Sequence, residues 1–187
     1  MSARAAISNV IAFDDGPSGG TDVPLVGAVW SGDRLDGVLI GRVRRDGANA
    51  TRVMAERIER SQFRGHVRAV LLQGIAVAGF NVVDVHALSA RLGLPVVVVV
   101  RRRPRLEAIR RALIGRVRGG SRKWRLVERA GPVEPLGPVF VQRVGLDRAA
   151  VERMFARLTI HGALPEPIRV AHLIAGALVG GVSRGRA

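Results

Sequence analysis

The sequence predicts an α/β fold built on a mixed sheet, and three observations support this prediction. Residues 96–100 are five consecutive valines, which favour a strand buried on both faces, as in the parallel centre of an α/β sheet. Residues 67–114 alternate between apolar strand patterns and helix patterns in the order βαβα, which is typical of parallel strands joined by helices. Residues 7–44 instead show strand patterns separated by glycine-rich turns, which predict antiparallel strands.

The antiparallel part comes first along the chain. Strands are expected near residues 7–14, 23–30 and 34–44, where alternating patterns lie between turn signals. The connection over residues 15–22 is rich in glycine, and residues 31–33 are few enough for a hairpin. These three strands therefore predict a meander at the start of the fold.

The helical and parallel part follows. Residues 48–62 predict an amphipathic helix that covers the sheet, because apolar residues recur at helical spacing along one side. The next elements are expected as a strand over residues 67–72, a helix over 81–92, a strand over 95–100 and a helix over 105–114. Asn81 is a candidate N-cap for its helix, and Pro104 suits the first turn of the helix that follows it.

The last third of the chain is expected to complete the sheet and its helical cover. Edge strands are predicted at residues 124–127 and 139–144, helices at 147–158 and 169–178, and a flexible tail at 180–187. A chain of 187 residues with 48% hydrophobic content can bury one core. We therefore expect residues 1–187 to form a single domain.

The composition narrows the cellular setting and the chemistry. No apolar run reaches the roughly 18 residues needed to cross a bilayer, and the N-terminal residues make a poor signal peptide. The sequence contains no cysteine, which excludes disulfides, thiol nucleophiles and thiolate metal sites. We expect a cytoplasmic protein without a membrane partner, in which any metal is held by Asp, Glu, His or backbone oxygen.

The chain is strongly basic, with a formal net charge of +15, and Lys123 is its only lysine. Residues 101–129 contain twelve basic and two acidic residues, so this segment supplies +10 of the total. Such an excess favours a polyanionic partner, and we expect nucleic acid, RNA or DNA. A solvated basic face is the alternative, and aromatic residues for base stacking are few.

Two adjacent carboxylates, Asp14 and Asp15, stand where the first strand ends. Carboxylates so close repel each other unless a cation, a proton or hydrogen-bond donors compensate, and a hard cation prefers oxygen ligands. The sequence Asp-Asp-Gly-Pro is also ordinary turn chemistry. A metal site and a turn both remain open at this point.

Other polar residues are expected at the same edge, because ligands of open α/β sheets bind beyond the carboxyl ends of the strands. Asp46 follows the third strand and is either a ligand or a helix-entry acid. Gln73 and Gly74 follow the fourth strand. The arginines that follow the valine strand are Arg101, Arg102 and Arg103.

Two further patterns mark candidate binding residues. Gly79 and Asn81 open a helix and form a candidate anion site, although they lack the full spacing of a dinucleotide or P-loop motif. Glu166, Arg169 and His172 recur every three residues and therefore lie near one face of a helix. A local ion pair with a solvent-facing histidine is the alternative for this second pattern.

These motifs together resemble an uncharacterised, mostly archaeal family of endonuclease V-like proteins. The resemblance covers nearly the whole chain and rests on separated blocks in a fixed order: residues 13–16, 46–51, 73–75, 79–84, 94–95 and 165–175. It implies a ribonuclease H-like fold. That fold has a mixed five-stranded sheet, with an antiparallel meander of strands 1–3, parallel strands 4–5 and helices on both faces.

The resemblance also implies a chemistry. Endonuclease V enzymes cleave nucleic acid with Mg²⁺ held by carboxylates, so Mg²⁺ or Mn²⁺ is the expected cofactor. By position, Asp14 matches the metal-binding Asp of the first strand, and Asp46 lies near the place of a second acid. Together with the adjacent Asp15, they are the expected metal ligands. Asp14, Asp46 and His172 are the expected catalytic residues. The residues expected to bind nucleic acid or phosphate are Gln73, Gly74, Gly79, Asn81, Arg101, Arg102, Arg103 and Arg169.

The chain departs from the enzymes at two of these positions. Gln73 stands where the enzymes have an Asp, and His172 stands where they have another. Because hard cations are held mainly by charge, both changes should weaken Mg²⁺ binding. Three functions follow as hypotheses: a nucleic-acid-binding protein with a degenerate or remodelled metal site, an active metal-dependent phosphodiesterase with altered ligands, or a binder of a small phosphorylated metabolite clamped by Arg101–Arg103.

Overall fold

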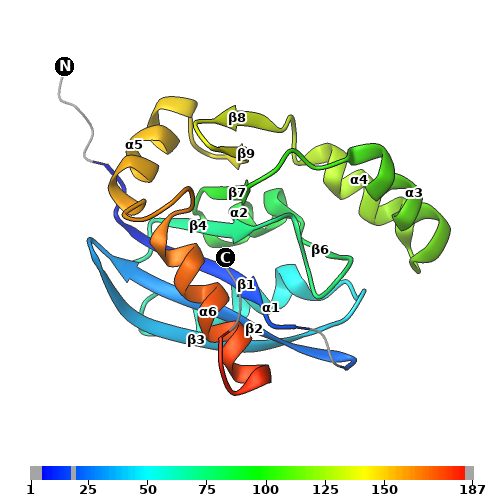
Figure 1. The fold of residues 1–187 in the computed structure, drawn as a ribbon, viewed down its shortest axis with the longest axis horizontal. Coiled ribbons are helices and arrows are strands. Elements are labelled where there is room, and N and C mark those ends of the chain that lie inside the picture. The colour runs from blue at the N-terminus through cyan, green and yellow to red at the C-terminus, as the bar shows by residue number, and fades with distance from the viewer. Residues whose placement is uncertain (1–5, 18–19, 184–187) are drawn as a thin grey trace.

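The fold is organised around one large mixed sheet. The structure is a computed structural model, and it describes residues 6–17 and 20–183. Seven strands lie in the order β3-β2-β1-β4-β7-β9-β8 (Figure 1). Their bounds are Asn9–Asp15 (β1), Asp22–Ser31 (β2), Arg34–Arg44 (β3), Ala69–Gln73 (β4), Val96–Val100 (β7), Glu134–Leu136 (β8) and Val139–Val144 (β9).

The pairing confirms the predicted mixture of directions. β1, β2 and β3 form an antiparallel meander, and β1, β4 and β7 are parallel neighbours. The five-valine strand β7 lies between β4 and β9, and its side chains alternate between the two faces. Val96 and Val98 pack into one hydrophobic cluster, and Val97 and Val99 pack into another. A strand buried on both faces explains why this segment contains no polar residue.

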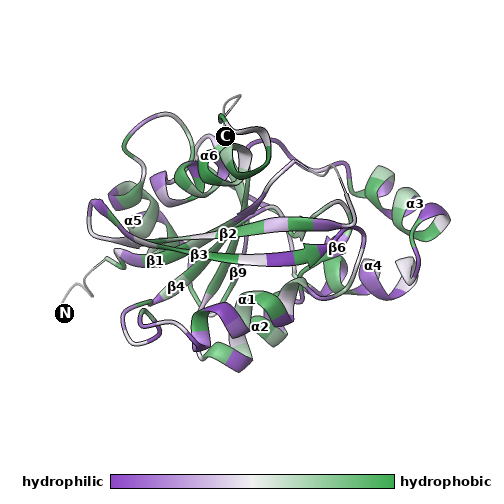
Figure 2. Cartoon of the chain, turned by 90° about the horizontal axis from the view of Figure 1, so that it is seen from below, coloured by the Kyte–Doolittle hydropathy of each residue, from purple (hydrophilic) through white to green (hydrophobic). Residues whose placement is uncertain are grey.

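Helices cover both faces of the sheet, as predicted. α1 (Ala50–Glu59) and α2 (Val85–Leu92) lie on one face, and α5 (Arg148–Leu158) and α6 (Glu166–Gly180) lie on the other (Figure 2). α6 lies across β1 and β2, where Ala171 and Ala175 are fully buried against Val26 and Ala28. Small side chains on both sides allow this helix to lie close to β1 and β2.

Two helices project beyond the sheet. α3 (Leu106–Arg116) and α4 (Gly120–Arg129) follow β7 and stand side by side at one end of the molecule (Figure 1). They pack on a two-stranded sheet formed by β5 (Ala76–Val77) and β6 (Asn81–Val82) through a separate apolar cluster. We call this pair of helices, residues 106–129, the arm.

Two sequence predictions about the sheet are wrong in detail. Residues 124–127 lie in α4 and form no edge strand, because the buried residues Gly120, Lys123 and Val127 recur at helical spacing. The sheet has seven strands and exceeds the predicted five because β8 and β9 extend it on one side. The predicted edge strand at 139–144 is confirmed as β9.

The helix predicted over residues 81–92 begins later than expected. It starts at Val85, and its N-cap is Asp84, whose carboxylate accepts a 3.0 Å hydrogen bond from the Ala87 N–H. Asn81 belongs to β6 and does not cap α2; its Oδ1 instead accepts a hydrogen bond from the Ala50 N–H at the start of α1. Near the C-terminus, α6 extends to Gly180, so the first residue of the predicted tail is the last residue of this helix. Residues 184–187 of the predicted tail lie outside the described residues.

Candidate active site

The two adjacent carboxylates at the end of β1 point to opposite faces of the sheet. Asp14 continues the alternation of Val10 and Ala12, which face α5 and α6, and its Oδ2 lies 2.7 Å from Nδ1 of His172 on α6. Asp15 is on the other face, where its Oδ2 accepts a 2.9 Å hydrogen bond from the Ala78 N–H. The period of two along a strand therefore separates these neighbours into different environments.

Asp14 is a buried acid with one strong partner. Its exposed fraction is 5%, and burial raises its pKa to about 6. The negative charge of Asp15 adds to this increase, and the hydrogen bond with His172 opposes it. A carboxyl group that changes charge near neutral pH beside an imidazole is a common arrangement at sites of proton transfer.

Gly16 allows α6 to approach the end of β1 closely enough for this pair to form. A Cβ atom at Gly16 would lie 2.8 Å from the carbonyl oxygen of Ala175 and 2.9 Å from a methyl carbon of Val179. Any larger residue would therefore push the helix away. The sequence pattern predicted Gly16 as part of a turn, whereas the structure gives it a packing role.

Gln73 lies beside Asp14 at the same edge of the sheet. The last registered pair between β1 and β4 is Phe13 with Leu72, so Asp14 and Gln73 follow on parallel strands. Gln73 follows Leu71 in the alternation and therefore shares the face of Asp14. Its Oε1 is buried without a hydrogen-bond partner among the described residues. An acceptor left unpaired costs about 1–3 kcal/mol, which a bound ligand or cation would relieve.

Asp46 does not join this group, so the structure does not bring together the three acids that were predicted to form one metal site. Its Oδ1 accepts a 2.8 Å hydrogen bond from the Phe80 N–H, and its backbone carbonyl accepts one from Lys123 Nζ. Asp46 and Ala78 both have positive φ angles, 51° and 48°. Among residues 6–17 and 20–183, no three His, Asp or Glu side chains gather closely enough to hold a metal ion.

At the predicted anion site, Gly79 and Asn81 have structural roles in packing and hydrogen bonding. Asn81 is fully buried, and its amide group bonds the Ala50 N–H, the Arg44 carbonyl and the Asn49 side chain, so it has no accessible group for a phosphate. At Gly79, with φ of 78°, a Cβ would lie 2.5 Å from Oδ1 of Asp46. Asn81 is therefore a correction to the predicted phosphate-binding residues, and for Gly74 and Gly79 that role stays a prediction.

The predicted face of α6 contains one ion pair and one site residue. The Arg169 guanidinium bonds the Glu166 carboxylate at 2.7–2.8 Å, and Glu166 is buried with an exposed fraction of 3%. His172 faces Asp14 and is bonded to it, so the alternative of a solvent-facing histidine is wrong for this residue. The ion-pair alternative is confirmed for Glu166 and Arg169.

Arg101, Arg102 and Arg103 follow β7 at the same sheet edge as Asp14, as expected, and all three are exposed. The Arg103 guanidinium carbon lies 5.4 Å from the centre of the Phe140 ring, within range of a cation–π contact. The polar residues at this edge therefore comprise a buried acid bonded to a partly exposed imidazole, an unpaired amide oxygen and a row of exposed arginines.

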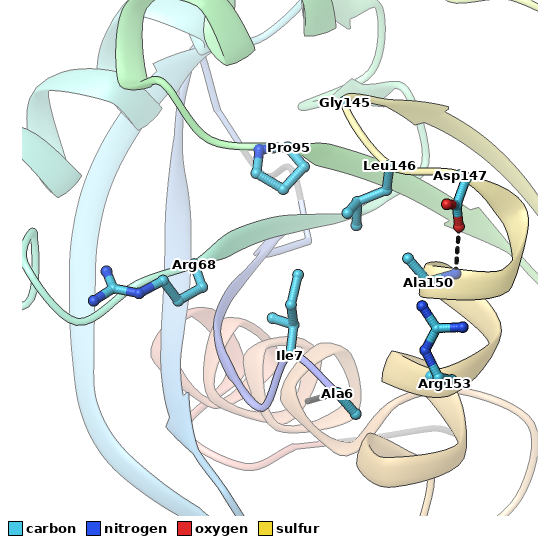
Figure 3. Close-up of a pocket in the computed structure, with 9 residues that line it drawn as sticks. All are labelled: Ala6, Ile7, Arg68, Pro95, Gly145, Leu146, Asp147, Ala150 and Arg153. Carbon is cyan, nitrogen blue, oxygen red and sulfur yellow. Dashed lines mark hydrogen bonds between the residues drawn. The ribbon is translucent and has the colours of Figure 1, made fainter. Parts of the chain in front are cut away.

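A cavity of about 450 Å³ lies at the opposite edge of the sheet, where β1, β4 and β7 begin (Figure 3). Its lining residues are Ala6, Ile7, Arg68, Pro95, Gly145, Leu146, Asp147, Ala150 and Arg153. Its carboxylate, Asp147, already accepts a hydrogen bond from the Ala150 N–H as the N-cap of α5. Because chemical sites of open α/β sheets lie at the carboxyl ends of the strands, the Asp14 edge is the better candidate.

Comparisons with known proteins identify the family of this chain. Residues 7–179 match the sequence profile of the family described as Endonuclease dU. The chain belongs to the endonuclease dU family. A UPF0215 protein of Deinococcus radiodurans is 51% identical over 183 residues, which is 96% of this chain and 93% of that protein. The predicted membership of an endonuclease V-like family is thereby confirmed.

Solved structures extend the comparison. A protein of unknown function from Archaeoglobus fulgidus has a TM-score of 0.89 at 31% identity, covering 94% of this chain and 100% of that one. Endonuclease V of Ciona intestinalis, in complex with a 24mer DNA that contains inosine, has a TM-score of 0.56 at 12% identity, covering 88% and 82%. The latter likeness shows the fold alone, and the expected ribonuclease H-like class is confirmed.

The helices were also compared with the requirements for crossing a bilayer. Within the described ranges, 6–17 and 20–183, none is both long and apolar enough to span a membrane.

Proposed function

We propose that this protein is an endonuclease that binds nucleic acid and hydrolyses a phosphodiester bond at the carboxyl edge of β1 and β4. The observation that carries this proposal is the buried Asp14 paired with the partly exposed His172, beside the unpaired Oε1 of Gln73. The name of the family, endonuclease dU, supports DNA that contains deoxyuridine as the substrate. The cytoplasmic location that the sequence predicts is part of the proposal.

The acid–imidazole pair supplies the proton transfer. Asp14 holds Nδ1 of His172, and this leaves Nε2 to exchange a proton with water or with a leaving oxygen. In hydrolysis, water attacks phosphorus and a bond from phosphorus to a sugar oxygen breaks. The water proton passes to the imidazole, and the leaving oxygen gains a proton. The exposed Arg101 and Arg102 carry the positive charge that attracts the phosphates.

The residues at this edge offer a divalent cation fewer ligands than the sequence predicted. Asp14 supplies one carboxylate and Gln73 one buried amide oxygen without a partner, whereas Asp15 and Asp46 are bonded elsewhere. Magnesium is often held by one or two carboxylates together with substrate phosphates and water. Mg²⁺ or Mn²⁺ at Asp14 and Gln73 would neutralise charge on the phosphoryl oxygens.

A second function, nucleic-acid binding without cleavage, is favoured by a separate observation. The carboxylates of Asp15 and Asp46 each bond a backbone N–H on the loop at residues 78–80. Only Asp14 remains as an anionic ligand at the edge, and one carboxylate binds a hard cation weakly. In this second function, the site would recognise DNA and leave the phosphodiester bond intact.

A cleavage assay separates the two functions. Oligonucleotides with one deoxyuridine, one deoxyinosine or neither, as single strands and duplexes, are incubated with Mg²⁺, Mn²⁺ or chelator. We expect cleavage near deoxyuridine by the wild type and its loss in Asp14→Asn, with DNA binding retained. Asp36→Asn, on the exposed strand β3, is the control. Binding without cleavage of any substrate would support the second function, and cleavage unaffected by Asp14→Asn would contradict the proposed site.

A further inference from the structure

We infer that the arm, residues 106–129, binds the phosphate backbone of double-stranded DNA and holds the duplex against the Asp14 edge. This inference rests on the proposed nucleic-acid function and adds the element that binds and the form of nucleic acid that it takes. The predicted phosphate contacts lie in the Arg101–Arg103 loop, whereas the arm is a separate pair of helices beyond it (Figure 1).

The arm is positively charged and has few acids to neutralise it. Its only acidic residues are Glu107 and Glu128. Exposed arginines with no carboxylate within 4.0 Å, in the part of the chain that the structure describes, are Arg111, Arg116, Arg118, Arg122 and Arg125. α4 has ten residues and is therefore about 15 Å long. Duplex DNA carries roughly nine phosphates over that length, so several arginines can each meet one.

The arm is held rigidly by its own packing. A Cβ at Gly120 would lie 1.8 Å from the Leu113 carbonyl oxygen, so the two helices meet in backbone contact at their junction. Leu113 and Val127 are buried in a cluster with Val82 of β6. A rigid basic surface loses little conformational entropy on binding, which favours it over a mobile basic tail as a binding element.

Two polar contacts fix the arm beside the candidate site. Lys123, buried within α4, donates from Nζ to the carbonyl oxygen of Asp46, and Arg129 pairs with Asp84. Asp46 is also bonded to Phe80, in the turn that Asp15 contacts through Ala78. The arm therefore stands at the sheet edge where β1 ends, and a duplex that lies on it reaches the same edge as Asp14 and His172.

The aromatic content of the arm favours a duplex over a single strand. Proteins that bind single strands stack bases on exposed aromatic rings. Trp124 is the only aromatic residue of the arm, and it is half-buried against the cluster around Val127. A surface with many arginines and few aromatic rings suits the phosphate backbone of a duplex, because the bases of a duplex already stack on one another. Contacts to phosphates alone predict binding that depends little on the DNA sequence.

Two variants with the same net charge test this inference. The arm variant is Arg116→Gln, Arg118→Gln, Arg122→Gln and Arg125→Gln. The control variant is Arg57→Gln, Arg60→Gln, Arg68→Gln and Arg153→Gln, at exposed positions toward the opposite edge of the sheet. Affinity for one 30-base-pair duplex and for one of its strands is measured between 50 and 200 mM NaCl. Circular dichroism and thermal unfolding verify that both variants fold.

We expect the arm variant to bind the duplex about 10- to 100-fold more weakly at 100 mM salt, and the control to stay within threefold of the wild type. The slope of log K against log salt should fall by about 3–4 for the arm variant, since each phosphate contact contributes about 0.9. Equal losses in the two variants, or tighter binding of the single strand by the wild type, would overturn the inference. A wild type that binds no nucleic acid would overturn the proposed function itself.

Discussion

The two faces of the sheet edge carry the same kinds of polar side chain, but these side chains differ in their hydrogen-bond partners. On the α1 and α2 face, Asp15 and Asp46 each accept a hydrogen bond from a backbone N–H, and Asn81 uses its whole amide group. On the α6 face, Asp14 has one titratable partner and Gln73 has an oxygen with none. A carboxylate bonded to backbone amides is fixed for structure, whereas one bonded to an imidazole can take part in proton transfer.

Exchanging one carboxylate on each face should produce the largest difference between them. We expect Asp14→Asn to lower the rate of DNA cleavage about 10³-fold, because loss of a general acid–base partner costs about 10²–10⁴. Asp15→Asn should keep the rate within about tenfold and the free energy of unfolding within about 1 kcal/mol, because its amide oxygen can still accept the hydrogen bond from the Ala78 N–H. Single-turnover cleavage and urea unfolding measure both. Equal rate losses in the two variants would show that the faces act as one site.

The Asp14→Asn variant should also differ from the wild type in how its stability depends on pH. The pKa of Asp14 rises from 3.8 to about 6 on folding, so the folded chain retains a proton that the unfolded chain releases between these values. The associated stability is present below pH 4 and is lost as the pH rises through 6, by about 3 kcal/mol in all. Asp14→Asn should therefore gain stability relative to the wild type between pH 4 and pH 8. Urea unfolding of the wild type and of Asp14→Asn at pH 4 and pH 8 measures this change. A difference in stability between the two proteins that is the same at both pH values would contradict the prediction.

The close approach of α6 can be weakened without changing any polar residue. Gly16→Ala places a methyl group against the Ala175 carbonyl, and we expect a loss of about 1–3 kcal/mol together with slower cleavage as His172 moves. Gly20→Ala is the matched control, because a Cβ at Gly20 meets no atom within 4 Å. Thermal unfolding and cleavage rates should separate the two variants. A Gly16→Ala protein with wild-type values would show that the helix adjusts freely.

The smallest effect is expected at Asp46. Asn tolerates a positive φ angle, and its amide oxygen can still accept the hydrogen bond from Phe80. Asp46→Asn should therefore keep the cleavage rate within about threefold and the free energy of unfolding within about 0.5 kcal/mol. A rate loss above a hundredfold, restored by added Mn²⁺, would return Asp46 to the metal ligands.

The central strands and most helices were predictable because their signals are local. The five valines of β7 and the amphipathic pattern of α1 each lie within one element. The strand predicted at 124–127 failed because four residues are too few to distinguish a period of 2.0 from one of 3.6. Only the longer segment, with Gly120 and Lys123 included, shows the helical spacing of α4.

The sequence predicted which edge of the sheet holds the candidate site better than it predicted which residues lie together there. Alternation along β1 already separates Asp14 from Asp15, but grouping the acids by resemblance ignored that signal. The partners of Asp46 lie 34 residues away at Phe80 and 77 residues away at Lys123, and no local pattern encodes contacts of that range. The pairing of Asp14 with His172, 158 residues apart, depends on the packing of α6 over the end of β1.

The buried position of Lys123 has a consequence for regulation. Lysine acetylation and ubiquitination need an accessible ε-amino group, and the only lysine of this chain is 5% exposed with Nζ bonded to a backbone carbonyl. The charge of the arm comes instead from arginines, which stay protonated at every physiological pH. Neither lysine-directed enzymes nor a shift in cellular pH would therefore remove the charge on which the inferred DNA binding depends.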